Sequence, residues 1–187
     1  MLMERTGVSA SHVVIRRYEY RRRLPHYQKD NRAVFVTFCK LLKGPFCDEA
    51  RDLVLEHCLH DHAVKYDLHA AIVMPDHVHM LFTPLRDPEG WPYSLPQILK
   101  MLKGTSARSV NRLLHEAGPV WQDEFFDHVL RSEESLREKI EYIRQNAVRR
   151  GLVEQPEQYR WLWVNPCGAD TPVRAVPGSS AMRQRGN

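Results

Sequence analysis

A predicted β-hairpin constrains the fold of this chain more than any other feature of its sequence. Residues 66–74 place apolar side chains at alternate positions, which is typical of a strand, and Pro75-Asp76 is a turn signal. Residues 77–83 then predict a returning strand. Strands joined by so short a turn pair in the antiparallel sense, so we expect an antiparallel sheet.

The rest of the chain predicts further strands and helices around this hairpin. We expect strands at residues 33–40 and within residues 120–130, and helices at residues 48–62, 95–115 and 133–150. The resulting order is strand, helix, strand, strand, helix, strand, helix. This order predicts an α+β domain with a largely antiparallel sheet and helices packed on one face.

Length and composition favour one folded domain with less regular ends. The 187 residues suffice to bury one hydrophobic core. We expect a basic N-terminal arm at residues 1–30, the folded domain at residues 31–163 and a disordered tail at residues 164–187, which is rich in Gly, Pro, Ser and Arg. No apolar run approaches the roughly 20 residues of a membrane helix. The first residues lack the apolar core of a signal peptide, so we expect a cytoplasmic protein.

The four cysteines favour reduced thiols over disulfides. They form no CxxC pair, and no secretory signal accompanies them. Cys58 lies in the run HCLHDH at residues 57–62, which contains potential zinc ligands, but it also continues the helical apolar pattern of Ala50 and Val54. We therefore favour a packed thiol at Cys58 over a zinc site.

The distribution of positive charge suggests nucleic acid as a partner. The formal net charge of +4 is modest, but arginines alternate with tyrosines in the N-terminal arm and cations recur along residues 95–115. Arginine interleaved with tyrosine suits phosphate contact together with base stacking, although solvated protein surfaces have a similar composition. The candidate DNA-binding residues are Arg21, Arg22, Arg23, Lys103 and Arg108.

The triplet His77-Val78-His79 is a candidate metal site on the returning strand. Side chains alternate along a strand, so His77 and His79 point to the same face. Two imidazoles on one face can hold a divalent metal and leave its other positions to further ligands. The alternative is a pair of ordinary histidines.

The last predicted helix carries a candidate nucleophile. Ser132 suits its N-cap and Gly151 its C-terminal end. Tyr142 and Asn146 lie one turn apart on one side of this helix, beside its apolar stripe rather than within it. Taken alone, the helix favours a partly exposed Tyr142 that has no special role.

Two longer runs resemble the REP-associated tyrosine transposases of the HUH single-tyrosine transposase superfamily. The run HAAIVMPDHVHMLF at residues 69–82 resembles the family segment in which two histidines flank a hydrophobic residue after a Met-Pro turn. The run VWQDEFFDHVLRSEESLREKIEYIRQNAVRRGL at residues 120–152 is similar to the family's Trp-Gln strand and Tyr-Ile-x-x-Asn helix. The resemblance covers roughly residues 21–163 and includes Leu24-Pro25-His26 and LKGTSAR at residues 102–108. One departure is Ala147, where the family usually has proline.

This resemblance implies a ferredoxin/RRM-like HUH core and a metal-dependent tyrosine DNA endonuclease. A divalent metal, Mg²⁺ or Mn²⁺, would be held by His77, His79 and Asn146. Tyr142 would attack single-stranded DNA and leave a 5′-phosphotyrosine and a free 3′-hydroxyl. The implied partner is single-stranded DNA with a hairpin formed by a palindromic repeat, and the protein would act as a monomer or a homodimer.

Two other functions compete with this interpretation. A DNA-binding regulator of the same fold would hold hairpins without cutting them, but it would not need His77, His79 and Tyr142 together. A metallohydrolase would also use the two histidines. The HxHxDH continuation typical of such hydrolases is missing, because Met80, Leu81 and Phe82 follow His79.

Overall fold

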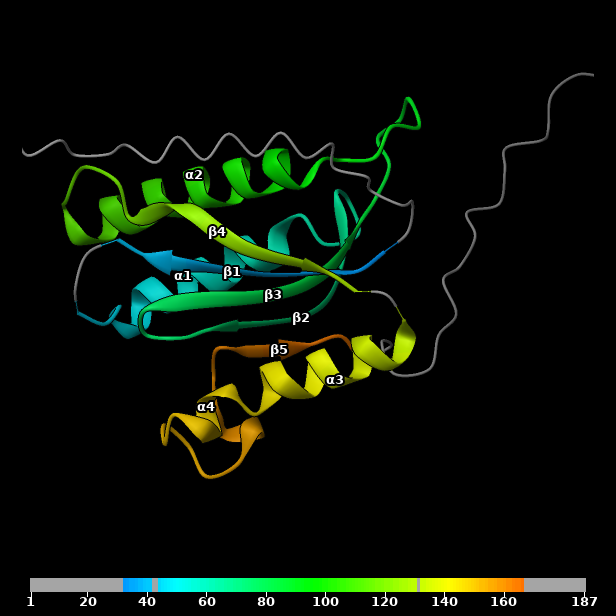
Figure 1. Ribbon diagram of the computed structural model, residues 1–187. Coiled ribbons are helices and arrows are strands. Elements are labelled where there is room, and N and C mark those ends of the chain that lie inside the picture. Colours follow the sequence, from blue (N-terminus) through cyan, green and yellow to red (C-terminus); the bar gives the residue numbers. More distant parts are fainter. Residues whose placement is uncertain (1–31, 42–43, 131, 167–187) are drawn as a thin grey trace, which may run out of the picture.

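A five-stranded antiparallel sheet organises the part of the chain that the structure describes. The structure is a computed structural model that describes residues 32–41, 44–130 and 132–166. The strand order is β4-β1-β3-β2-β5 (Figure 1). In chain order the elements are β1 (Val34–Lys40), α1 (Asp48–His60), β2 (Tyr66–Val73), β3 (His77–Pro84), α2 (Leu95–Leu114), β4 (Trp121–Val129), α3 (Glu133–Arg144), α4 (Asn146–Arg149), the 3₁₀ turn η1 (Pro156–Gln158) and β5 (Leu162–Val164). The predicted α+β class with a largely antiparallel sheet is confirmed.

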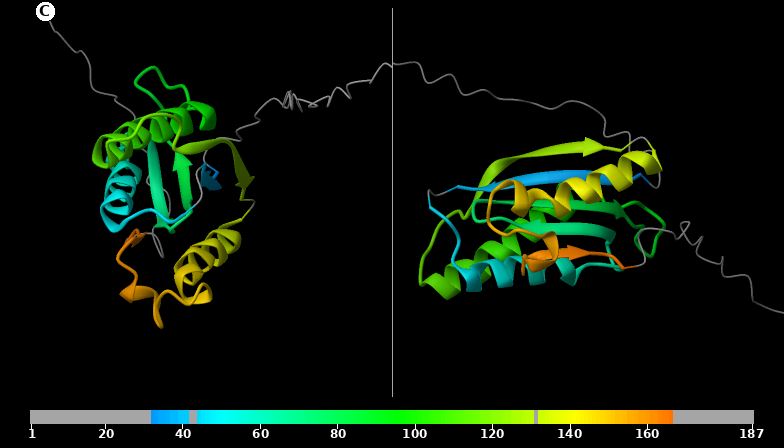
Figure 2. Two further views of the ribbon diagram at one scale, coloured as in Figure 1. Left: turned by 90° about the vertical axis from the view of Figure 1, so that its left-hand side faces the viewer. Right: turned by 90° about the horizontal axis from the view of Figure 1, so that it is seen from below.

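The two faces of the sheet are covered by different helices (Figures 1 and 2). Helices α1 and α2 pack on one face, where the Trp121 indole donates to the Ser106 hydroxyl at 3.0 Å. Helix α3 packs on the other face, where the Tyr142 ring meets the Phe35 ring at 5.8 Å. The expected packing of helices on one face therefore holds for α1 and α2, but α3 departs from it. The reason lies in β3, whose residues from His77 to Phe82 are all buried and so need cover on both faces.

Helix α2 shows why the sequence forms these elements where it does. Ser94 accepts a hydrogen bond from the Gln97 backbone N–H, and the Gln97 side chain accepts one from the Ser94 N–H in return. The helix ends at His115, whose φ of 55° leaves the helical region. Its buried stripe includes Ile98 and Leu102. No helix in the described ranges is long and apolar enough to cross a membrane.

The last helix differs from its expected span. The sequence predicts one helix at residues 133–150, whereas the structure divides it into α3 and α4 at Gln145. Gln145 has a ψ of −3°, and its N–H is shared between two carbonyls of the preceding turn, which tightens the chain locally. The break falls between Tyr142 and Asn146, so helical periodicity alone does not fix their relative directions.

Cys58 is fully buried, and burial raises its pKa to about 12. The neighbouring His57 bonds the Ser109 hydroxyl through Nε2 at 2.9 Å. Cys58 is therefore a packed thiol, as favoured from the sequence.

The described structure continues past β5 to residue 166, and the backbone N–H of Asn165 donates to the His69 carbonyl on β2. The N-terminal arm at residues 1–30 and the tail from residue 167 lie outside the described residues.

The hydroxyl of Tyr66 on β2 connects the core to α1 by a hydrogen bond. Tyr66 is buried and donates to the Cys58 carbonyl at 2.9 Å. Tyr66→Phe leaves that buried carbonyl without this donor, so we expect a loss of about 1–2 kcal/mol in the free energy of unfolding. Urea denaturation followed by circular dichroism measures it, and an unchanged midpoint would contradict the role given to the hydroxyl.

Candidate active site

Strand β3 presents two histidines whose ring nitrogens face one another. His77 and His79 lie on the same face of the strand, as expected from alternation, and both are buried. Their Nε2 atoms are 3.1 Å apart. Two nitrogens bound to one first-row metal ion at about 2.1 Å are themselves about 3 Å apart. The spacing of the pair therefore matches that of two ligands of one ion.

The other ring nitrogen of each histidine is held from behind. Nδ1 of His77 lies 2.7 Å from the Asp76 carboxylate, and Nδ1 of His79 lies 2.7 Å from the Thr37 hydroxyl. Asp76 can only accept from His77, so a neutral His77 ring that donates from Nδ1 keeps its lone pair on Nε2. When His79 likewise donates from Nδ1 to Thr37, both lone pairs converge on one point, which a cation would stabilise. Outer hydrogen bonds of this kind orient histidine ligands in metal sites.

The protonation states suit this arrangement. Burial lowers the pKa of His79 to about 3, and the nearby His77, Arg150 and Lys139 add to the lowering. His79 is therefore a neutral imidazole at physiological pH, which is the ligand form. Partial burial acts to raise the pKa of Asp76, but its hydrogen bond to His77 and the charge of Arg150 outweigh burial, so the pKa is lowered and the carboxylate stays ionised.

Tyr142 on α3 lies against this histidine pair. Its ring centroid is 5.8 Å from that of His79 and 5.8 Å from that of Phe35. Ile143, the next residue, is fully buried and anchors the helix to the core. The contact joins α3 to β3 across the sheet face, and periodicity within either element could not have predicted it.

Asn146 lies, along the chain, between two residues that reach the surroundings of this pair. Tyr142, before it, contacts His79, while Arg150, after it, lies 3.7 Å from the Asp76 carboxylate beside His77. The Asn146 side chain is buried and makes no hydrogen bond to another described residue. Within the described ranges no three His, Cys, Asp or Glu side chains form a metal-binding group. The geometry thus brings together the two imidazoles, and the Asn146 amide oxygen stays a prediction as a third ligand.

Cations surround the tyrosine. The Lys139 ammonium lies 5.1 Å from the centre of the Tyr142 ring, and the Arg149 guanidinium lies 4.8 Å from it. With Arg150 beside Asp76, they give this side of the sheet a positive potential that attracts phosphate. Lys139 is not among the site residues predicted from the sequence, although its position three residues before Tyr142 places it on the same helix side.

The candidate DNA-binding residues of α2 do not reach this site. Lys103 donates from its ammonium to the backbone carbonyls of Gln122 and Asp123 on β4, and burial lowers its pKa. Arg108 is exposed on the same helix, which covers the opposite face of the sheet. The remaining candidates, Arg21, Arg22 and Arg23, lie outside the described residues.

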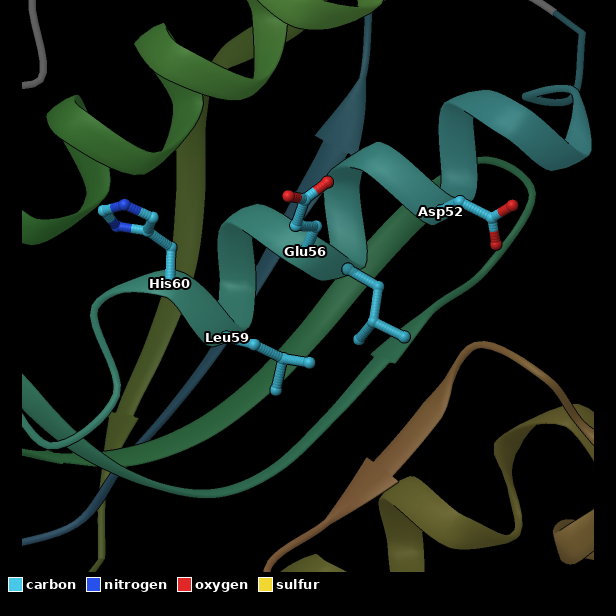
Figure 3. Close-up of a pocket in the computed structure, with 5 residues that line it drawn as sticks. Asp52, Glu56, Leu59 and His60 are labelled. Atoms are coloured by element: carbon cyan, nitrogen blue, oxygen red, sulfur yellow. The ribbon is translucent and has the colours of Figure 1, made fainter.

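A shallow pocket elsewhere in the fold is distinct from the histidine site. It runs along α1 and is lined by Asp52, Leu55, Glu56, Leu59 and His60 (Figure 3). These residues share one side of the helix, as their spacing requires. Asp52 is already engaged, because it accepts a hydrogen bond from the Trp161 indole at 2.9 Å. We assign this pocket no catalytic role.

Comparison with known proteins identifies the family. Residues 12–146 match the sequence model of the IS200-like transposase family. The chain belongs to the IS200-like transposase family. This transposase is 25% identical over 114 residues to a REP-associated tyrosine transposase of Haemophilus influenzae, an alignment that covers 58% of this chain and only 63% of the relative.

A solved structure supports the same assignment at the level of the fold. It is the structure of a REP-associated tyrosine transposase bound to a REP hairpin. It matches this chain with a TM-score of 0.60 at 15% identity. The match covers 86% of this chain and 98% of the solved one. The resemblance to REP-associated tyrosine transposases that the motifs indicated is confirmed.

Proposed function

We propose that this transposase nicks and rejoins single-stranded DNA through a covalent bond to Tyr142. The observation that carries the proposal is the contact of the Tyr142 ring with His79, between the cations of Lys139 and Arg149. A phenol next to a phosphate-attracting surface is suited to nucleophilic attack on a phosphodiester. The alignment with the relative from Haemophilus influenzae spans less than two thirds of that protein, so the proposal rests on the geometry of this site.

In the proposed reaction, the Tyr142 hydroxyl oxygen attacks the scissile phosphorus and gives up its proton. The bond from phosphorus to the preceding 3′ oxygen breaks, and that oxygen takes up a proton to leave as a free 3′-hydroxyl. A 5′-phosphotyrosine remains on the protein. It retains the energy of the phosphodiester, so attack by a 3′-hydroxyl restores the DNA strand and frees the tyrosine without ATP.

His77, His79 and Asn146 would hold a divalent metal for this reaction. When bound, the metal supplies Lewis-acid polarisation of the scissile phosphate. The donor set contains two nitrogens, so it suits Mn²⁺ at least as well as Mg²⁺, which prefers oxygen. Asp76 and Thr37 would keep the two imidazoles oriented, while Lys139 and Arg149 would neutralise charge on the bound phosphate.

Hairpin-forming DNA is the substrate class that we propose. The solved structure with this fold is described as bound to a REP hairpin, and the curated relative is likewise REP-associated. A nicking assay on a single-stranded hairpin oligonucleotide, with and without divalent cation, tests the proposal against its competitors. Cation-dependent nicking supports the transposase reaction, binding without nicking supports a regulator, and hydrolysis without a covalent adduct supports a metallohydrolase.

Binding of DNA should depend steeply on salt and on DNA form. Each phosphate that a cation such as Lys139 or Arg149 neutralises should add about 0.7 to 0.9 to the slope of log affinity against log salt. We expect tighter binding to a hairpin-bearing single strand than to plain duplex of equal length, as measured by fluorescence anisotropy at several salt concentrations. Equal affinity for both forms at physiological salt would indicate generic basic binding instead.

A further inference from the structure

The aromatic side chain of Phe126 on β4 is exposed on the sheet face that carries the histidine pair. It is 60% exposed. Its neighbour Phe125 faces α2, since the Lys103 ammonium of that helix lies 6.0 Å from the Phe125 ring. Side chains alternate along a strand, so Phe126 points to the opposite face, the face of His79.

The strand register connects Phe126 to the candidate active site. Phe126 pairs with Thr37 on β1, and Thr37 pairs with His79 on β3, whose Nδ1 lies 2.7 Å from the Thr37 hydroxyl. Phe126 is thus two strands, or about 10 Å, from His79 across the sheet. The exposed His128 sits beside it and pairs with Phe35, whose ring stacks on His79 at 5.3 Å. Phe126 and His128 therefore extend the surface of the site across β1 to β4.

On this face of the sheet the β4 side chains Phe126 and His128 are exposed, whereas β2 and β3 are covered. Helix α3 packs against β2 and β3, and the exposure of Phe126 and His128 shows that it does not cover β4 in the described structure. Figure 2 shows β4 at the sheet edge away from β5. The Lys139 ammonium lies over the same face, 4.9 Å from the Phe35 ring. An exposed ring on the same sheet face as a cation can contact a base while the cation contacts a phosphate.

We propose that Phe126 stacks on a base of the single-stranded DNA next to the scissile phosphate and so holds the strand in register with Tyr142. The proposal rests on the proposed function, because a DNA strand whose phosphate lies at Tyr142 carries its bases over the adjoining surface. Stacking on an aromatic ring accepts every base. Phe126 would therefore position the strand without reading its sequence.

Two oligomers of equal length separate base stacking from phosphate binding: a short oligothymidylate and its fully abasic analogue. Binding is measured by anisotropy in the Tyr142→Phe background with chelator present, so that no cutting takes place. We expect Phe126→Ala to weaken binding of the oligothymidylate at least about 5-fold and to leave binding of the abasic oligomer unchanged. Phe126→Trp should keep the preference. The matched control is Trp91→Ala, which removes another exposed aromatic side chain, in the loop between β3 and α2, and should change neither affinity.

Loss of affinity for both oligomers alike, or for neither, would overturn the stacking proposal. An unchanged preference combined with an altered oligomeric state in light scattering would also overturn it, and would assign Phe126 to a contact between protein copies. The outcome is separable from that of the proposed function. A base preference that depends on Phe126 in a protein that forms no DNA adduct would contradict nicking alone, whereas adduct formation with a preference independent of Phe126 would contradict stacking alone.

Discussion

Replacing Tyr142 with phenylalanine should abolish both the nick and the covalent protein–DNA adduct while leaving DNA binding in place. The substitution removes only a hydroxyl, which makes no hydrogen bond to another described residue. The ring keeps its contacts with Phe35 and His79 and its place beneath the Arg149 guanidinium. The free energy of unfolding should therefore fall by about 1 kcal/mol or less.

Tyr93→Phe is the matched control for this substitution. Tyr93 is also half-buried, but it lies in the segment before α2 and not among the cations around Tyr142. It should nick at the wild-type rate. Undiminished nicking by Tyr142→Phe, with circular dichroism and anisotropy confirming a folded, DNA-binding protein, would refute the assignment of the nucleophile.

Loss of either histidine of the pair should reduce nicking more than about 100-fold. Changes to residues that merely orient metal ligands cost 10- to 100-fold in metal affinity or activity, so removal of a ligand should cost more. We expect this loss for His77→Ala and for His79→Ala, with Mg²⁺ and with Mn²⁺ alike. Mn²⁺ binding measured by calorimetry should weaken in parallel.

The controls for the histidine variants address folding. His79 is buried against Phe35, so His79→Ala leaves a space in the core. His79→Gln fills more of that space and is therefore tested as well, and circular dichroism checks the fold of each variant. His60→Ala removes a histidine from the exposed side of α1 and should leave nicking unchanged. Full activity in both His77→Ala and His79→Ala would remove the metal site from the account.

Local sequence patterns predict most elements of this fold, because turn residues and apolar spacing act over a few neighbouring positions. Pro75-Asp76 forms the turn between β2 and β3, and the apolar spacing from Leu95 onward matches α2. The shared face of His77 and His79 also follows from alternation within one strand. Each of these features depends on residues a few positions apart, and no distant contact decides them.

Other features depend on contacts between distant segments, which no local pattern contains. Strand β5 has only three residues and forms by pairing with β2, where Trp163 lies opposite Ala71. The break at Gln145 and the packing of α3 on the second face were missed for the same reason. Lys103 has the spacing of a DNA-binding cation, yet tertiary structure turns it toward β4. Thr37 and Lys139 gain their proposed roles only because β1 and α3 meet at His79.

The adduct itself tests the central claim most directly. The wild-type protein is incubated with a labelled single-stranded hairpin oligonucleotide and Mn²⁺, the covalent complex is digested, and the modified peptide is identified by mass spectrometry. We expect one phosphotyrosyl adduct, at Tyr142, joined to the 5′ end of the cut DNA, with a free 3′-hydroxyl on the released strand. An adduct on any other residue, or nicking without any covalent adduct, would contradict it.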